Sequence, residues 1–235
     1  MKKFKRFSLV ELLIVMAVFS ILLSLLNPAL RRALDGAKSI QCGGQLKTIS
    51  QSVFQFVDDH NGYLPNGYFN NEAYPQWWVK LSSYTTNDGT LSQRLPLYTC
   101  PNATYRANLI EFPYTYSCHP QVMPGQDEVP TGVRPESLKR PSEIMLIGDA
   151  DQVWTSTGDC WLTFKNPSQW LYTSSAADGD KTIPIYENQD FNPGAQNFLR
   201  YRHLNETNVN TMMVDGGVQS FLMGTVVQKN ISNSY

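Results

Sequence analysis

The sequence predicts an α+β protein in which a long N-terminal helix packs on a small antiparallel β-sheet with long irregular loops. Three observations support this fold class: a twenty-residue apolar run near the N-terminus, an amphipathic helical pattern after it, and short alternating segments with a hairpin signal towards the C-terminus. With 235 residues, 42% of them hydrophobic, the chain can bury one ordinary core. We therefore expect one globular head behind an N-terminal anchor.

The apolar run, residues 7–26, has the length of a transmembrane helix. It carries one charge, Glu11, and at about 1.5 Å per residue it spans a hydrocarbon core of about 30 Å. Four cations lie in the first six residues, which predicts a cytoplasmic N-terminus and an exported head. A cleavable secretory signal fits less well, because its apolar region is shorter and ends at small residues. An ordinary signal anchor remains the alternative.

Glu11 distinguishes between these interpretations. A carboxylate within an apolar span costs about 2.5–3.5 kcal/mol on insertion scales, so its presence indicates a partner or a function. In an isolated anchor Glu11 has no use. In a helical filament it could meet a cation of a neighbouring subunit, such as a newly made N-terminal amine, and set the register of assembly.

The helix is predicted to continue beyond the apolar run as a stem. Pro28 removes one backbone donor and should kink the helix. Beyond it, apolar side chains recur at spacings of 4, 3, 4 and 3, as one face of a helix does: Cys42, Leu46, Ile49, Val53 and Phe56. A stem from about Ser8 to Val57 would be about 75 Å long. Gly62 and Pro65 then favour its end.

The head contains four strand-like segments. Residues 114–118 alternate, residues 144–147 form a short apolar run, and residues 209–214 and 218–222 flank a strong hairpin signal, Asp215-Gly216. Residues 77–81 predict a short helix or strand packed on the stem. Residues 151–197 have no clear period and are expected to form an irregular, exposed insertion.

No catalytic residue is predicted. The chain has no Gly-x-Ser-x-Gly elbow, His-Glu-x-x-His motif, P-loop or dinucleotide fingerprint, and its net charge of −1 gives no indication of nucleic acid binding. Asp149 with Asp151, and Asp178 with Asp180, could each offer two oxygen ligands to calcium, and solvated turn aspartates are the simpler interpretation. We expect no cofactor and leave calcium open.

Four cysteines stand far apart: Cys42, Cys100, Cys118 and Cys160. Without paired C-x-x-C spacing, metal binding through sulfur is not expected. An even number of cysteines outside the cytoplasm favours one or two disulfides, with three possible pairings, and buried thiols are the alternative.

Residues Phe7 to Leu12, reading Phe-Ser-Leu-Val-Glu-Leu, resemble the cleavage and methylation motif of type IV prepilins and type II secretion pseudopilins. The resemblance implies cleavage between Arg6 and Phe7 by a prepilin peptidase, followed by N-methylation of Phe7. It places Glu11 at the fifth mature position, where that family keeps its glutamate. The residue before the cut is usually glycine in the family, whereas here it is Arg6.

Beyond the motif, the chain is similar to pseudopilin-like proteins of planctomycetes and related bacteria that carry a domain of unknown function. The similar segments are residues 42–65, Cys100-Pro101, residues 141–149, Arg202-His203 and Asp215-Gly216. In that family Asp-Gly is usually followed by histidine, and this chain has Gly217 instead. The resemblance implies a pilin-like fold and favours pairing Cys42 with Cys100 and Cys118 with Cys160. Some secretion pseudopilins also hold calcium in a head loop.

Together these features predict a structural subunit, a pseudopilin or minor pilin, rather than an enzyme. Residues 1–6 would be a basic leader, 7–26 the membrane half of the stem, 27–57 its periplasmic half and 58–235 the head. The expected location is the bacterial inner membrane, with the head periplasmic or at the cell surface. The expected partners are the prepilin peptidase, other pilin subunits, the assembly platform and the bilayer. The alternative is a membrane-anchored periplasmic binding module or enzyme.

Overall fold

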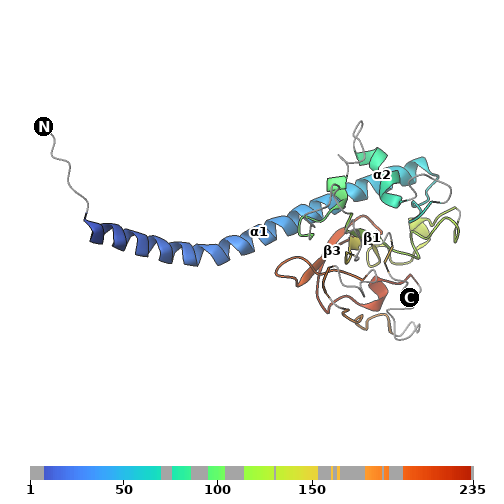
Figure 1. Ribbon diagram of the computed structural model, residues 1–235. Coiled ribbons are helices and arrows are strands. Elements are labelled where there is room, and N and C mark those ends of the chain that lie inside the picture. Colours follow the sequence, from blue (N-terminus) through green and yellow to red (C-terminus); the bar gives the residue numbers. More distant parts are fainter. Residues whose placement is uncertain are drawn as a thin grey trace.

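The computed structural model describes residues 8–69, 76–85, 95–103, 114–129, 131–152, 160, 163–164, 178–186, 188–190 and 198–233. A long helix, α1 (Leu9–Asp59), leads from the N-terminus into a head built around a small sheet (Figure 1). The basic leader and Phe7 lie outside the described residues. The α+β fold class predicted from the sequence is confirmed.

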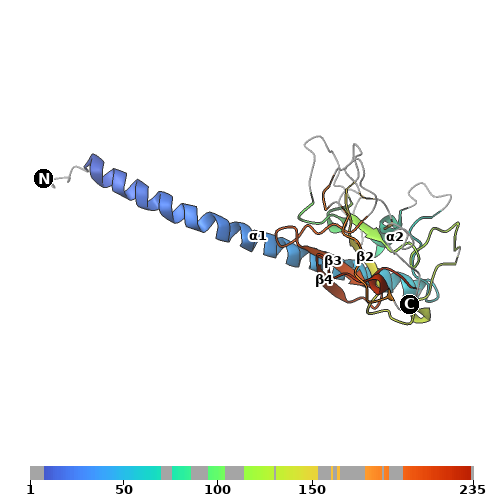
Figure 2. The ribbon, with the colours of Figure 1, turned by 90° about the horizontal axis from the view of Figure 1, so that it is seen from below.

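Helix α1 has 51 residues, which gives a length of about 75 Å. Its first half projects away from the head, and its second half lies along it (Figures 1 and 2). Among the described residues, α1 is the one helix long and apolar enough to cross a membrane. In the second half, the predicted stripe from Cys42 to Phe56 is buried, as the 4-3-4-3 spacing indicated.

Pro28 lies inside α1, and the helix continues through it. Figure 1 shows a gentle curve along the helix. The kink predicted specifically at Pro28 stays a prediction.

The end of α1 follows the expected glycine signal. Asn61 and Gly62 take positive φ values of 55° and 86°, and the N–H of Gly62 donates to the carbonyl of Val57 over 2.9 Å. The His60 ring stacks on Phe56 with a centroid distance of 3.7 Å. The helix therefore runs two residues beyond the predicted end at Val57, because the left-handed turn begins only at Asn61.

The sheet has four antiparallel strands in the order β1-β2-β3-β4: β1 (Tyr116–Cys118), β2 (Met145–Asp149), β3 (Asn208–Met213) and β4 (Val218–Leu222). Each strand overlaps a segment predicted from the sequence. Helix α2 (Trp77–Thr85) packs on α1, and the short 3-10 helices are η1 (Leu95–Tyr98), η2 (Pro135–Ser137) and η5 (Gln228–Asn230). The predicted β3-β4 hairpin is confirmed, with Gly216 at φ 84°.

The hairpin turn rests directly on α1. The carbonyl oxygen of Gly216 accepts hydrogen bonds from Lys47 Nζ and Ser50 Oγ, each over 3.1 Å. A Cβ atom at position 216 would lie 2.5 Å from a ring carbon of Phe54. The turn thus joins the sheet to the stem, and only glycine suits both its backbone conformation and its close approach to the helix.

Most of the insertion expected at residues 151–197 lies outside the described residues. Its described part is not wholly exposed, because Asp151, Gln152, Cys160 and Phe164 are buried. Cys160 and Phe164 belong to a second apolar cluster, beside the one formed by α1, α2 and the sheet.

Candidate functional site

The first candidate site is the exposed apolar half of α1. Every large apolar side chain from Leu9 to Leu34 is between 50% and 76% exposed. Such a continuous apolar surface is unstable in water, so its partners must be lipid or other protein chains. This half of the helix is therefore built for contacts outside the chain.

Glu11 lies in the first turn of this helix. Its Oε2 atom accepts a hydrogen bond from the backbone N–H of Ser8 over 2.9 Å, at an exposed position. The bond satisfies one of the backbone donors left free at a helix N-terminus, and the helix dipole favours a negative charge there. The carboxylate is thus held at the end of α1, next to the predicted cleavage point.

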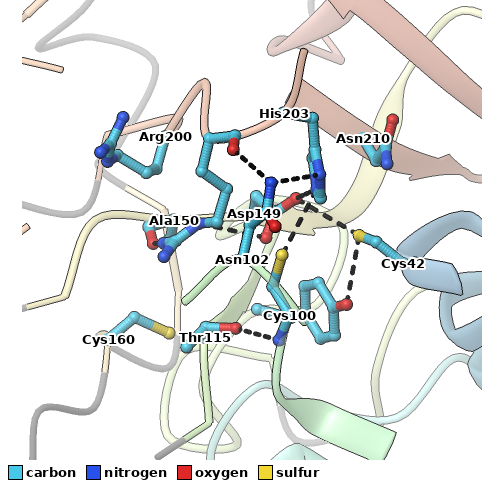
Figure 3. A network of polar contacts seen from close by, with 12 residues as sticks. Cys42, Cys100, Asn102, Thr115, Asp149, Ala150, Cys160, Arg200, His203 and Asn210 are labelled. Carbon is cyan, nitrogen blue, oxygen red and sulfur yellow. Dashed lines mark hydrogen bonds and ion pairs between the residues drawn. The ribbon is translucent and has the colours of Figure 1, made fainter. Parts of the chain in front are cut away.

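The second candidate site is a buried cluster that brings together four distant segments (Figure 3). Cys42 comes from α1, Cys100 follows η1, Asp149 ends β2, and His203 precedes β3. All four side chains are fully buried. One ligand-type atom from each lies within 4.8 Å of the others, and this is the one such group among the described residues.

The contacts within the cluster converge on two atoms. His203 Nε2 lies 3.0 Å from Asp149 Oδ2 and 3.3 Å from Cys100 Sγ. Cys42 Sγ lies 3.5 Å from the same Asp149 oxygen. Figure 3 shows the four side chains pointing towards one another. One carboxylate oxygen, one ring nitrogen and two sulfurs therefore surround a common point.

A second layer of side chains holds the cluster in place. Arg202 Nε pairs with the other oxygen of Asp149, Oδ1, over 3.4 Å, and the Arg202 guanidinium also donates to the carbonyl of Ala150. Asn102 Nδ2 lies 3.5 Å from His203 Nδ1, the ring nitrogen facing away from the cluster. The Tyr116 hydroxyl lies 3.3 Å from Cys42 Sγ. These contacts fix the orientation of three of the four side chains.

The electrostatics of the cluster separate its two sulfurs. Burial raises the pKa of the Cys42 thiol, but hydrogen bonds from Cys100 and His203 outweigh it, so this pKa lies below its ordinary value. Burial, then the bond to Cys42, raises the pKa of Cys100 well above its ordinary value. Burial lowers the pKa of His203, but the hydrogen bond to Asp149 raises it to about 9. The cluster thus moves the pKa values of its two thiols in opposite directions and favours a charged imidazole at neutral pH.

The arrangement does not resemble a nucleophilic triad. Such a triad uses opposite nitrogens of its histidine, one facing the nucleophile and one facing the acid. Here Nε2 of His203 faces both Cys100 and Asp149. Full burial also leaves no room for a substrate. Two sulfurs, one ring nitrogen and one carboxylate oxygen around one point instead form a donor set of the kind that surrounds a metal ion.

Sequence reasoning missed this cluster. Cys42 and Cys100 were expected in disulfides and Asp149 was weighed for calcium, whereas His203 was not a site candidate. About 50 residues separate each member from the next, and no local spacing joins them. The one available signal was the resemblance, which covers Cys100, Asp149 and the pair Arg202-His203.

All four cysteines are buried thiols, and no disulfide joins them in the structure. Cys42 lies beside Cys100 in the cluster. Cys160 Sγ lies 3.4 Å from the Ser117 hydroxyl, next to Cys118 in sequence. The two pairings favoured by the resemblance therefore join neighbouring regions, and they stay predictions.

The aspartates weighed for calcium have protein partners. Asp151 Oδ1 accepts from the backbone N–H of Phe198 over 3.1 Å. Asp178 pairs with Lys181 over 2.6 Å, and Asp180 pairs with Lys229 over 2.9 Å. These contacts are those of structural turn residues, and the expectation of no cofactor, with calcium left open, stays a prediction.

The fold and the exposed half of α1 define a class: an α+β head carried on a single membrane-length helix, consistent with pilin-like proteins. Residues 2–27 match the family model of the prokaryotic N-terminal methylation motif. The chain therefore carries a prepilin-type N-terminus, which supports a type IV pilin-like protein. No curated protein and no solved structure matches the chain.

Proposed function

We propose that this protein is a pseudopilin or minor pilin, a structural subunit of a filament of the type II secretion or type IV pilus kind. The observation that carries the proposal is the methylation motif at residues 2–27 on a helix whose apolar half has no partner within the described residues. The subunit waits in the inner membrane, with its head in the periplasm. Prepilin peptidase cleaves it between Arg6 and Phe7 and methylates the new N-terminus.

Assembly then transfers the apolar half of α1 from lipid to a bundle of neighbouring helices. Lipid tails and apolar side chains are similar solvents, so apolar contact alone gives little preference for one helix register over another. Glu11 supplies that preference, because pairing with the N-terminal amine of a neighbouring Phe7 neutralises a carboxylate that is costly in the membrane. The assembly platform and a cytoplasmic ATPase provide the energy, and the growing filament moves or organises secreted cargo.

The first test is the mass of the intact protein purified from its native membrane, with fragmentation from the N-terminus. We expect a chain that begins at Phe7 and carries one added methyl group on its amine. A chain that still begins at Met1 or Lys2 would contradict the proposal and favour an ordinary signal anchor.

The second test is replacement of Glu11 by Gln, which keeps the size and removes the charge. We expect the variant to be inserted and processed but absent from sheared or purified filaments. Glu128→Gln is the matched control, because it removes an exposed carboxylate from the head, and it should assemble as the wild type does. A normal yield of filaments from the Glu11→Gln variant would contradict the proposed role of Glu11 in assembly and favour a membrane-anchored binding module.

A further inference from the structure

We propose that Cys42, Cys100, Asp149 and His203 together bind one zinc ion that fastens the stem helix to the head. This inference is independent of filament assembly, because it concerns only the folding of the single chain.

The donor set selects the class of metal. Two sulfurs, one imidazole nitrogen and one carboxylate oxygen are the ligands of tetrahedral zinc sites, whereas calcium and magnesium prefer six or more oxygens. All four donors come from the chain and are fully buried, so no position is open for water or substrate. A closed site of this kind is structural rather than catalytic.

The spacing of the donors matches the size of a zinc ion. Bond lengths of about 2.3 Å to sulfur and about 2.0–2.1 Å to nitrogen and oxygen place tetrahedral donors about 3.3–3.8 Å apart. The observed separations are 3.0 Å between His203 Nε2 and Asp149 Oδ2, 3.3 Å between His203 Nε2 and Cys100 Sγ, and 3.5 Å between Cys42 Sγ and Asp149 Oδ2. The other three separations lie within 4.8 Å, so inward shifts of up to about 1 Å would complete the site.

The surrounding contacts are those that orient metal ligands. Asp149 turns Oδ2 to the cluster while Arg202 holds Oδ1, so the carboxylate is presented through one oxygen. Asn102 lies at Nδ1 of His203, on the opposite side of the ring from the donor nitrogen. Such outer contacts fix the ring orientation and ligand geometry at metal sites.

Charged groups next to the site are paired. Zinc and two thiolates sum to zero, and on binding the thiol protons and the proton on His203 Nε2 pass to solvent, which leaves a neutral imidazole as ligand. The remaining carboxylates, Asp149 and Asp190, face two buried guanidinium groups, Arg200 and Arg202. Arg200 also pairs with Glu206, whose side chain is 64% exposed, so each buried guanidinium group faces at least one carboxylate.

A disulfide between Cys42 and Cys100 is the competing use of the same sulfurs. It would need an S–S distance of about 2.05 Å and would involve neither Asp149 nor His203. The ion explains why a carboxylate and an imidazole converge on the two sulfurs, whereas the disulfide does not. The two states exclude each other, because a disulfide sulfur has no thiolate to offer a metal.

The position of the site suggests what the ion does. Cys42 is the first fully buried residue of α1, at the point where the stem reaches the head. The other three ligands come from the segment after η1, from β2 and from the segment before β3. One ion thus fastens the helix to three parts of the head that are far apart in sequence.

The test uses the full chain purified in mild detergent under reducing conditions, loaded with zinc and dialysed against metal-free buffer. Elemental analysis should find one zinc per chain. Cys42→Ser, Cys100→Ser and Asp149→Asn should each lower zinc affinity at least tenfold. Cys118→Ser and Cys160→Ser are matched controls, because they alter buried cysteines outside the cluster, and they should keep the metal.

Cobalt replaces zinc in the second measurement, which needs no variant and so does not depend on a variant's folding. The wild-type chain should show the visible absorption of tetrahedral cobalt together with a sulfur-to-cobalt charge-transfer band. Zinc loading should also raise the Tm by roughly 5–10 °C relative to the chelator-treated protein.

Three results would each overturn the inference. The first is a protein with free thiols that binds neither ion. The second is a protein from the native membrane whose digest contains a linked Cys42–Cys100 peptide and no zinc. The third is zinc retained at wild-type affinity when a ligand is replaced.

Discussion

The two halves of α1 form one continuous helix, yet they meet opposite surroundings. From Leu9 to Leu34 every large apolar side chain is at least half exposed, whereas from Cys42 to Phe56 one stripe is buried against the head. Contacts within this chain therefore stabilise only the second half of the helix. The first half is completed by lipid or by other subunits, so mutations in the two halves should differ in kind.

The largest expected effect is on the buried stripe. Leu46 is fully buried, and Leu46→Ala should lower the free energy of unfolding by about 3–5 kcal/mol, through lost burial and the cavity left behind. Unfolding by urea in detergent can be followed by fluorescence, because Trp77 and Trp78 lie in the same core. Leu22→Ala, at a position 59% exposed, is the control and should change this energy by less than about 0.5 kcal/mol. Equal losses of unfolding free energy in the two variants would contradict the difference described between the two halves of α1.

A buried histidine gives the head a pH dependence that the membrane half lacks. Burial lowers the pKa of His119 from 6.5 to about 4, against opposing backbone hydrogen bonds. The unfolded chain therefore binds more protons between these values, and stability falls as pH drops from about 6.5 to about 4. The loss attributable to His119 should be about 3 kcal/mol, with no further change from this residue below pH 4.

Urea unfolding at several pH values between 4 and 7 measures this loss. His119→Gln keeps a polar side chain and removes the titration, so its stability should depend less steeply on pH than that of the wild type. The same slope in both proteins would show that the acid response of the head has another source.

The sequence predicts the elements of the fold better than it predicts the buried cluster. The stripe from Cys42 to Phe56 and the hairpin at Asp215-Gly216 follow from patterns within a few residues, so local sequence reveals them. The β-strands were also found: β4 has the predicted bounds, and the bounds of the other three differ by at most two residues. Patterns within a few residues therefore predict the stem helix and the four strands, whereas the sequence left residues 77–81 as helix or strand and did not predict the 3-10 helices.

The cluster could not be found in this way because its geometry is entirely tertiary. Cys42 looks like an ordinary apolar position on a helix face, and Asp149 like a polar residue that ends a strand. Spacing rules for metal sites rest on two ligands in one turn or one hairpin, and here every ligand comes from a different element. Only the packing of α1 on the sheet brings the four together.

The joint between stem and hairpin should respond less strongly than the core. Gly216→Ala places a Cβ 2.5 Å from Phe54 at a φ of 84°, and should cost about 2 kcal/mol of unfolding free energy. Gly44→Ala is the matched control, since a Cβ there meets nothing within 4 Å and lies inside a helix. It should stabilise by up to about 1 kcal/mol. Changes of the same sign would show that the turn does not contact α1 as described.

Replacement of Glu11 should have the smallest effect on the stability of the single chain, although Glu11 has the largest proposed effect on assembly. Within the described residues, Glu11 accepts a hydrogen bond from the N–H of Ser8 at the start of α1, and this end of α1 lies far from the head (Figure 1). Glu11→Gln should therefore change the unfolding free energy of the head by less than about 0.5 kcal/mol. Urea unfolding of the same preparation used for the filament assay makes the comparison direct. A head destabilised by more than 1 kcal/mol would mean that failed assembly reflects failed folding. The first half of α1 would then also contribute to the stability of the single chain, contrary to the division described above.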